Sequence, residues 1–151
     1  MEINFNIIIN GYNNKIYNFI QEGKIMILGN GIDLIKNQRI AALIDKYGEH
    51  FLNKIYTKNE IKYCRTKSDS AVSFAARFAA KEALLKALGT GMRNNSWKDI
   101  EVNNNELGKP EINLSGKTEV LAESKKVRSI FLSISHEKKY SIAQIILEGD
   151  K

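Results

Sequence analysis

The sequence predicts a single α+β domain in which a long, buried helix packs against a mostly antiparallel sheet. Two observations support this fold class. Apolar residues recur at helical spacing through the first half of the chain, whereas short alternating segments dominate the second half. A length of 151 residues also suits one hydrophobic core and is short for two.

The first half should contain one early strand followed by helices. The apolar run KIMILG ends in glycine and predicts a strand over about 24–29. Apolar residues over 40–47 recur at helical spacing and resume after Gly48, which predicts a helix, a break and a second short helix. Thr57 and Glu60 have the spacing of a capping box, so a further short helix is expected to start there.

A long helix follows, and it is apolar on almost every side. Asp69 or Ser70 can cap its N-terminus. The helix should end near Leu88, where Gly89 and Gly91 stop it. A helix of this kind is normally buried in the core.

The second half changes to the spacing of strands. WKDIEVNN (97–104) and KPEINLSG (109–116) predict two short strands joined by a turn. Residues 116–126 predict a helix. RSIFLSIS (128–135) and YSIAQIILE (140–148) then predict a hairpin with the polar tip HEKK. The early strand could join the resulting sheet.

Composition limits the possible partners and the surroundings of the protein. The net charge of +6 and a pI near 9.3 favour nucleic acid, phosphorylated small molecules or an acidic protein, and charge alone does not choose among them. A single cysteine, Cys64, excludes an internal disulfide and fits a reducing compartment. No apolar run reaches the roughly 18 to 20 residues of a membrane span, so we expect a soluble protein.

Glu82 lies in the middle of the long helix and is the first candidate for chemistry. On a helical wheel, Arg77 and Lys81 share one edge, and Glu82 and Lys86 share the other. A buried carboxylate is costly unless it is paired or bound to a cation. An i,i+4 ion pair with Lys86 is the ordinary interpretation, and a metal site is the alternative.

Asp33 is the second candidate, in GNGID just after the first predicted strand. It could cap a helix that begins near residue 35 or 36. Together with Glu82 it could instead hold one hard divalent ion, because Mg²⁺ typically takes one or two carboxylates and fills its other positions with water and phosphate.

A third group suits phosphate. Lys86, the GTG turn at 89–91 and Lys109 offer positive charge and exposed N–H donors. Taken alone, GTG matches no standard phosphate-binding loop and reads as a helix stop. His136, in the predicted hairpin tip, would by itself be an ordinary surface histidine.

Four segments together resemble the holo-[acyl-carrier-protein] synthases, a family of 4′-phosphopantetheinyl transferases. They are GNGIDLIKNQRI (29–40), RFAAKEALLKALGTG (77–91), LGKPEI (107–112) and SISHEKKYSIAQIILE (133–148). These segments occur in the order and at the spacing of the family, and the resemblance covers about 25–148. It implies the 4′-phosphopantetheinyl transferase fold.

The resemblance also implies roles for individual residues. Asp33 and Glu82 would be the Mg²⁺ ligands, and Lys86 would contact the phosphates of coenzyme A. The catalytic set would be these three residues. The nucleotide site would be lined by Arg77, Phe78, Gly89, Thr90 and Gly91, with Pro110 and His136 nearby across a subunit boundary.

The implied reaction moves 4′-phosphopantetheine from coenzyme A to a serine hydroxyl of apo-acyl carrier protein, in fatty-acid biosynthesis. Adenosine 3′,5′-bisphosphate would be released. The nucleophile would belong to the partner, in agreement with the lack of a Ser/His/Asp or Cys/His arrangement in this sequence. Either Glu82 or a metal-bound water could take the serine proton, and the sequence does not decide between them.

The family also implies partners and an assembly. Arg39 matches the docking arginine for the acidic carrier protein, and Lys36 and Lys46 could extend the patch. The small members of the family form homotrimers with active sites between subunits. The rival interpretations are a nucleic-acid-binding module and a coenzyme A-binding protein without catalysis. Against the first, no predicted helix has a concentrated basic face. Neither nucleic acid nor a membrane is expected as a partner.

The chain departs from the family at its start. Members begin within a few residues of the first strand, whereas here residues 1–23 precede a domain expected to span 24–151. These residues lack the features of a secretory signal. They form an N-terminal extension of unassigned role, and the compartment would be cytoplasm in a bacterium or plastid stroma in a plastid-bearing eukaryote.

Overall fold

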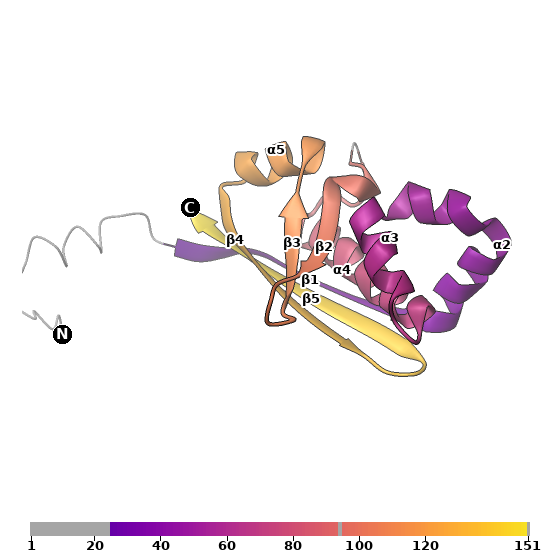
Figure 1. The fold of residues 1–151 in the computed structure, drawn as a ribbon. Coiled ribbons are helices and arrows are strands. Elements are labelled where there is room, and N and C mark those ends of the chain that lie inside the picture. The colour runs from indigo at the N-terminus through magenta and orange to yellow at the C-terminus, as the bar shows by residue number, and fades with distance from the viewer. Residues whose placement is uncertain (1–24, 94, 151) are drawn as a thin grey trace, which may run out of the picture.

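The computed structural model describes residues 25–93 and 95–150, and the N-terminal extension over 1–23 lies outside the described residues. A three-stranded antiparallel sheet has the strand order β1-β5-β4, and β2 and β3 form a separate antiparallel pair (Figure 1). The strands are β1 (Ile25–Lys36), β2 (Ile100–Asn104), β3 (Pro110–Leu114), β4 (Val127–His136) and β5 (Tyr140–Asp150).

The long helix α4 packs on one face of the three-stranded sheet, against β1 and β5. Helices α2 and α3 contact α4 and gather at one end of the molecule, whereas α5 lies at the other end (Figure 1). The bounds are α2 (Asn37–Ile55), α3 (Lys58–Arg65), α4 (Ser70–Leu88) and α5 (Gly116–Ser124), with a short 3₁₀ helix, η1 (Trp97–Asp99). The prediction of an α+β fold with a buried long helix is confirmed.

Helix α4 is buried because it is sandwiched between the sheet and the other helices. Alanines give it a narrow side: Ala75, Ala79, Ala80 and Ala83 are all fully buried. The Asp69 side chain accepts a hydrogen bond from the Val72 amide and caps the N-terminus. Gly89 ends the helix in the left-handed conformation, with φ of 72°, as the sequence predicted.

Strand β1 approaches helix α4 closely enough for the two backbones to touch. A Cβ atom at Gly31 would stand 2.0 Å from the Ala83 carbonyl oxygen, and one at Gly29 would stand 2.2 Å from that of Ala87. Only glycine fits such a contact. Because side chains alternate along a strand, Asp33 lies on the same face as Gly31 and is carried toward α4.

The first strand is much longer than predicted. Pairing with β5 continues from Ile25 opposite Asp150 to Lys36 opposite Tyr140, with one irregularity between Ile27 and Gly29. Glycines in this segment therefore serve a close approach and not a turn. Asp33 lies inside the strand, so the alternative that it caps a helix is excluded.

The other predicted elements agree in type with few exceptions. Gly48 breaks α2 with φ of 51°, and Thr57 and Glu60 form the expected capping box at the start of α3. The expected strand over 97–104 begins only at Ile100, because the Ser96 hydroxyl accepts a hydrogen bond from the Lys98 amide and holds η1 in place. The strands form two sheets where one was expected.

A buried ion pair joins α3 to α4, and the sequence did not reveal it. Lys81 Nζ lies 2.8 Å from Glu60 Oε2, and neither side chain is exposed. Lys81 Nζ also lies within 3.1 Å of the carbonyl oxygens of Ile55, Trp97 and Ile100. Glu60 Oε1 in turn accepts a hydrogen bond from the Val102 amide. Burial lowers the pKa of Lys81, and the carboxylate of Glu60 opposes that shift.

Asn37, the first residue of α2, fixes the hairpin between β4 and β5. Its side-chain amide donates to the Glu137 carbonyl at 2.7 Å, and its oxygen accepts from the Ser141 hydroxyl at 2.7 Å. The Asn37 backbone amide donates to the Lys139 carbonyl. The hairpin that carries His136 at the end of β4 is therefore tied to the helix that follows Asp33.

Candidate active site

Asp33, Glu82 and Lys86 lie together where β1 crosses α4. Lys86 Nζ donates to Asp33 Oδ1 at 2.8 Å and to the Ile32 carbonyl at 3.0 Å. Among the described residues, no ion pair joins Lys86 to Glu82, so the i,i+4 pair of the ordinary interpretation does not form. The ammonium group already bridges the strand and the helix.

The two carboxylates of this group influence each other. Burial raises the pKa of Glu82, and the nearby charge of Asp33 raises it further. Lys86 and Arg39 act in the opposite direction. Arg39 is exposed in the first turn of α2, so a basic surface residue contributes to the electrostatics of Glu82.

This donor set fits a hard divalent cation. Asp33 and Glu82 supply carboxylate oxygens from two rigid elements, and the Asp33 oxygen with the Ile32 carbonyl already binds one cationic group. Mg²⁺ requires only one or two carboxylates when phosphate and water complete its shell. Across 25–93 and 95–150, no third acidic, histidine or cysteine side chain completes a closed metal cage.

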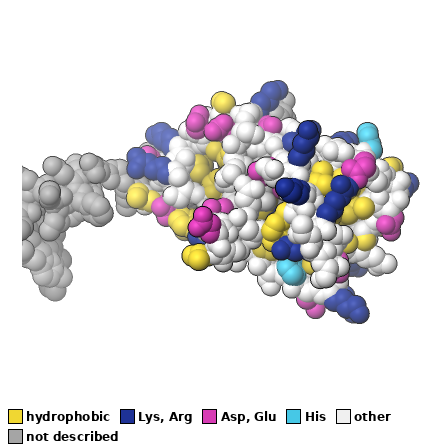
Figure 2. Space-filling view, in the orientation of Figure 1, with side chains coloured by type: hydrophobic (Ala, Val, Ile, Leu, Met, Phe, Trp, Pro, Cys, Tyr) yellow, Lys and Arg dark blue, Asp and Glu magenta, His cyan; other side chains and the backbone are white. Residues whose placement is uncertain are grey.

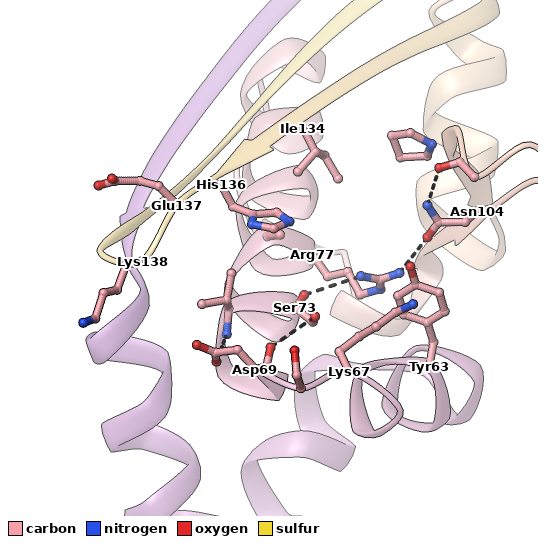
Figure 3. A pocket seen from close by; sticks show the side chains of 15 residues that line it. Tyr63, Lys67, Asp69, Ser73, Arg77, Asn104, Ile134, His136, Glu137 and Lys138 are labelled. Atoms are coloured by element: carbon pink, nitrogen blue, oxygen red, sulfur yellow. Dashed lines mark hydrogen bonds between the residues drawn. The ribbon is translucent and has the colours of Figure 1, made fainter.

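Arg77, Pro110 and His136 line a different feature, a cavity of about 850 Å³ (Figure 3). Tyr63, Asn104 and the basic residues Lys67 and Lys138 also line it. The Arg77 side chain is 5% exposed, and its Nη2 donates to Asn104 Oδ1 at 2.9 Å. The structure therefore brings three of the predicted nucleotide-site residues together from α4, β3 and β4.

The remaining predicted residues lie elsewhere. Phe78 stacks on Trp97 with ring centroids 5.1 Å apart. Gly89 and Thr90 line a separate hollow of about 360 Å³ with Arg93 and Lys117, and Gly91 is a left-handed turn residue with φ of 55°. In this chain neither Phe78 nor the GTG turn lines the cavity that contains Arg77.

Sequence reasoning missed Tyr63 and Asn104 in that cavity. Asn104 precedes the LGKPEI segment by three residues, which is the only local signal for it. Nothing in the sequence distinguishes Tyr63 from other helical aromatic residues.

Its neighbour Cys64 is fully buried, and burial raises the pKa of the thiol to about 12, in agreement with an inert core cysteine.

The two groups of residues occupy opposite sides of α4. Arg77 and Lys86 are nine positions apart, which corresponds to about 13 Å along the axis and about half a turn around it. The Asp33 and Glu82 carboxylates and the Arg77 cavity are therefore separate features of one chain.

Comparison with known proteins identifies the family. Residues 29–145 match the family model described as the 4′-phosphopantetheinyl transferase superfamily. The chain belongs to this superfamily. The transferase is 47% identical over 123 residues to a protein of Halothermothrix orenii named holo-[acyl-carrier-protein] synthase, and the match covers 82% of this chain and 98% of that protein.

Solved structures of similar proteins share the fold of this transferase. The holo-[acyl-carrier-protein] synthase of Neisseria meningitidis matches with a TM-score of 0.75 and 33% identity, over 81% of this chain and 98% of that one. The synthase of Bacillus anthracis, solved in complex with CoA (3′,5′-ADP), matches with a TM-score of 0.69 and 38% identity, over 83% and 99%. The predicted 4′-phosphopantetheinyl transferase fold is confirmed.

The surface of the transferase bears charges of both signs. Figure 2 shows several basic side chains close together near the middle of this face, with further basic and acidic side chains around them. Within the described part of the chain, no helix combines the length and the apolar character needed to cross a bilayer.

Proposed function

We propose that this transferase moves 4′-phosphopantetheine from coenzyme A to a serine hydroxyl of apo-acyl carrier protein in fatty-acid biosynthesis. The pair of Asp33 and Glu82 with Lys86 beside it is the observation that carries the proposal. The names of the relatives and the CoA complex of the Bacillus anthracis protein support the substrates.

Asp33 and Glu82 would hold a Mg²⁺ ion, which would supply neutralising charge to the diphosphate of coenzyme A. Lys86 adds a point charge that suits a phosphate oxygen. The serine oxygen of the carrier protein attacks the β-phosphorus as the bond to the bridging oxygen breaks. Adenosine 3′,5′-bisphosphate leaves with that electron pair, and the serine proton is released.

We further propose that the protein is a homotrimer in which neighbouring subunits share each active site. The Asp33 and Glu82 pair and the Arg77 cavity lie on opposite sides of α4, so a second copy could place its Arg77 cavity beside the Asp33 and Glu82 pair of the first. An apolar surface is available for such contacts, since Ile32 and Leu34 on β1 and Phe131 on β4 are 53%, 62% and 49% exposed.

Mass spectrometry tests the proposed activity directly. Apo-acyl carrier protein incubated with the enzyme, coenzyme A and Mg²⁺ should gain the mass of one phosphopantetheine group. The gain should disappear when the divalent ion is chelated and return when Mg²⁺ is restored. No gain with several carrier proteins would refute the proposal, and tight binding of nucleic acid with a steep salt dependence would favour the rival function.

Arg39 should act in carrier docking. Carrier proteins of this class are acidic, and Arg39 is exposed and its charge acts on Glu82. Arg39→Glu should therefore raise the KM for carrier protein about tenfold or more while leaving the KM for coenzyme A nearly unchanged. Lys54→Glu makes the same charge change at the exposed far end of α2 and serves as the control. Equal losses for both substrates would contradict the docking role.

A further inference from the structure

Arg77 is a buried cation that forms no ion pair with a carboxylate in the described part of the chain. Its side chain is 5% exposed, and among the described residues no ion pair includes it. Its Nε is buried and has no hydrogen-bond acceptor within 25–93 and 95–150. Buried charges in proteins are normally paired or bind an ion, because an uncompensated one is costly. The counter-charge of Arg77 is therefore to be sought in the cavity that it lines.

Neutral groups hold the Arg77 guanidinium on two sides. The Tyr63 ring lies with its centroid 4.0 Å from Arg77 Cζ, which is the distance of a stacked cation–π contact. Asn104 Oδ1 accepts from Nη2 at 2.9 Å, and the Ser73 carbonyl accepts a longer bond from Nη1 (Figure 3). None of these groups neutralises the positive charge.

Asn104 is itself fixed. Its Nδ2 donates to the Gly108 carbonyl at 2.8 Å, in the turn that leads to Pro110. Since the other end of the amide must accept from Arg77, only one orientation of the side chain satisfies both bonds. The guanidinium is thus held between α3, which carries Tyr63, and the turn between β2 and β3.

The cavity around the guanidinium favours an anion. Lys67 and Lys138 line it with Arg77, and Lys67 Nζ lies 4.3 Å from the centroid of the same Tyr63 ring. Asp69 also lines the cavity, but its carboxylate accepts a hydrogen bond from the backbone amide of Val72, in the first turn of α4. Three cationic residues therefore line a space of about 850 Å³, and Glu137 is the other acidic residue in its lining.

We propose that Tyr63 and Asn104 are positioning residues that orient Arg77 to receive a phosphate group of the nucleotide. The inference rests on the proposed function, because it takes the nucleotide to be that of coenzyme A. Arg77 contacts the phosphate, and Tyr63 and Asn104 act through Arg77. Holding the guanidinium in place beforehand lowers the entropy lost on binding.

Calorimetric binding of adenosine 3′,5′-bisphosphate and adenosine 5′-monophosphate to the assembled protein tests the proposal. Asn104→Asp keeps the acceptor but adds an internal counter-charge for Arg77, so we expect affinity for the bisphosphate to fall about tenfold or more. Tyr63→Leu removes the ring and should also weaken binding. Tyr63→Phe keeps the ring and should bind like the wild type.

The two nucleotides distinguish the source of the phosphate. A loss confined to the bisphosphate supports the proposal and assigns the 3′-phosphate to Arg77, whereas an equal loss for both supports it and assigns the 5′-phosphate. Turnover should show a raised KM for coenzyme A with kcat nearly unchanged in Asn104→Asp. Wild-type affinity for both nucleotides in Asn104→Asp and Tyr63→Leu would overturn the proposal, as would a fall in kcat with KM unchanged.

Failure of this inference is separable from failure of the proposed function. Wild-type enzyme that modifies carrier protein, combined with unaltered nucleotide affinity in the variants, refutes only the positioning role. Wild-type enzyme that binds the bisphosphate but never modifies a carrier protein refutes only the transferase activity. Thermal unfolding of each variant identifies those that fold like the wild type, and Tyr63→Phe supplies the matched control for the loss of the ring.

Discussion

Replacing Glu82 with glutamine should lower kcat for carrier-protein modification by at least about a hundredfold. The amide keeps the shape of the side chain but removes the charge that a divalent ion needs. The thermal stability of the variant, in contrast to its kcat, should not fall. Burial and the charge of Asp33 raise the pKa of Glu82, so the ionised form of Glu82 is disfavoured in the folded state. The variant with a neutral side chain should therefore unfold at an equal or higher temperature than the wild type.

Glu106→Gln is the control for this experiment. Glu106 is exposed in the turn between β2 and β3, and its replacement makes the same chemical change away from Asp33. We expect wild-type turnover and no gain in stability for this variant. Near-normal turnover in Glu82→Gln would return Glu82 to a structural role, even if its thermal unfolding behaved as expected.

Replacing Lys81 with methionine should lower the free energy of unfolding by about 3–5 kcal/mol, because Glu60 would remain as an uncompensated charge in the core. Chemical denaturation at one fixed protein concentration measures the change, since assembly would also contribute to stability. Unlike Glu82→Gln, this substitution is expected to act first on the fold.

A double variant tests the physical cause. Glu60→Gln in the Lys81→Met background removes the leftover charge while an amide oxygen can still accept from the Val102 amide. Part of the lost stability should therefore return. The cycle of two single variants and one double variant gives the interaction energy between Lys81 and Glu60. A Lys81→Met protein as stable as the wild type would contradict a stabilising role for the buried ion pair. A double variant less stable than additivity predicts would do the same.

Periodicity revealed the local structure, and it drew attention to Glu82. A carboxylate on a helix that is apolar almost all round needs a partner, and that argument requires only the sequence of α4. The identity of the partner was not accessible in this way. The residues offered the pairing of Asp33 with Glu82 only as an alternative to a helix cap, and the family resemblance favoured it. The length of β1 was missed because the glycines that permit contact with α4 look like turn residues.

Contacts between distant segments explain the other misses. Lys81 and Glu60 are 21 positions apart on different helices, so no spacing rule connects them. The Arg77 cavity also includes Tyr63 from α3 and Asn104 from the end of β2, and neither residue lies in a segment with a recognisable motif. Residues that position a functional side chain carry a weaker local signal than the side chain itself.

The contact between Gly31 and Ala83 has a consequence for changing this enzyme. It sets the separation of the strand carrying Asp33 and the helix carrying Glu82 by main-chain atoms alone, with no side chain between them. Apolar residues deeper in the molecule can therefore vary without moving the two carboxylates apart. The proposed reaction centre can thus keep its dimensions while the residues around it change.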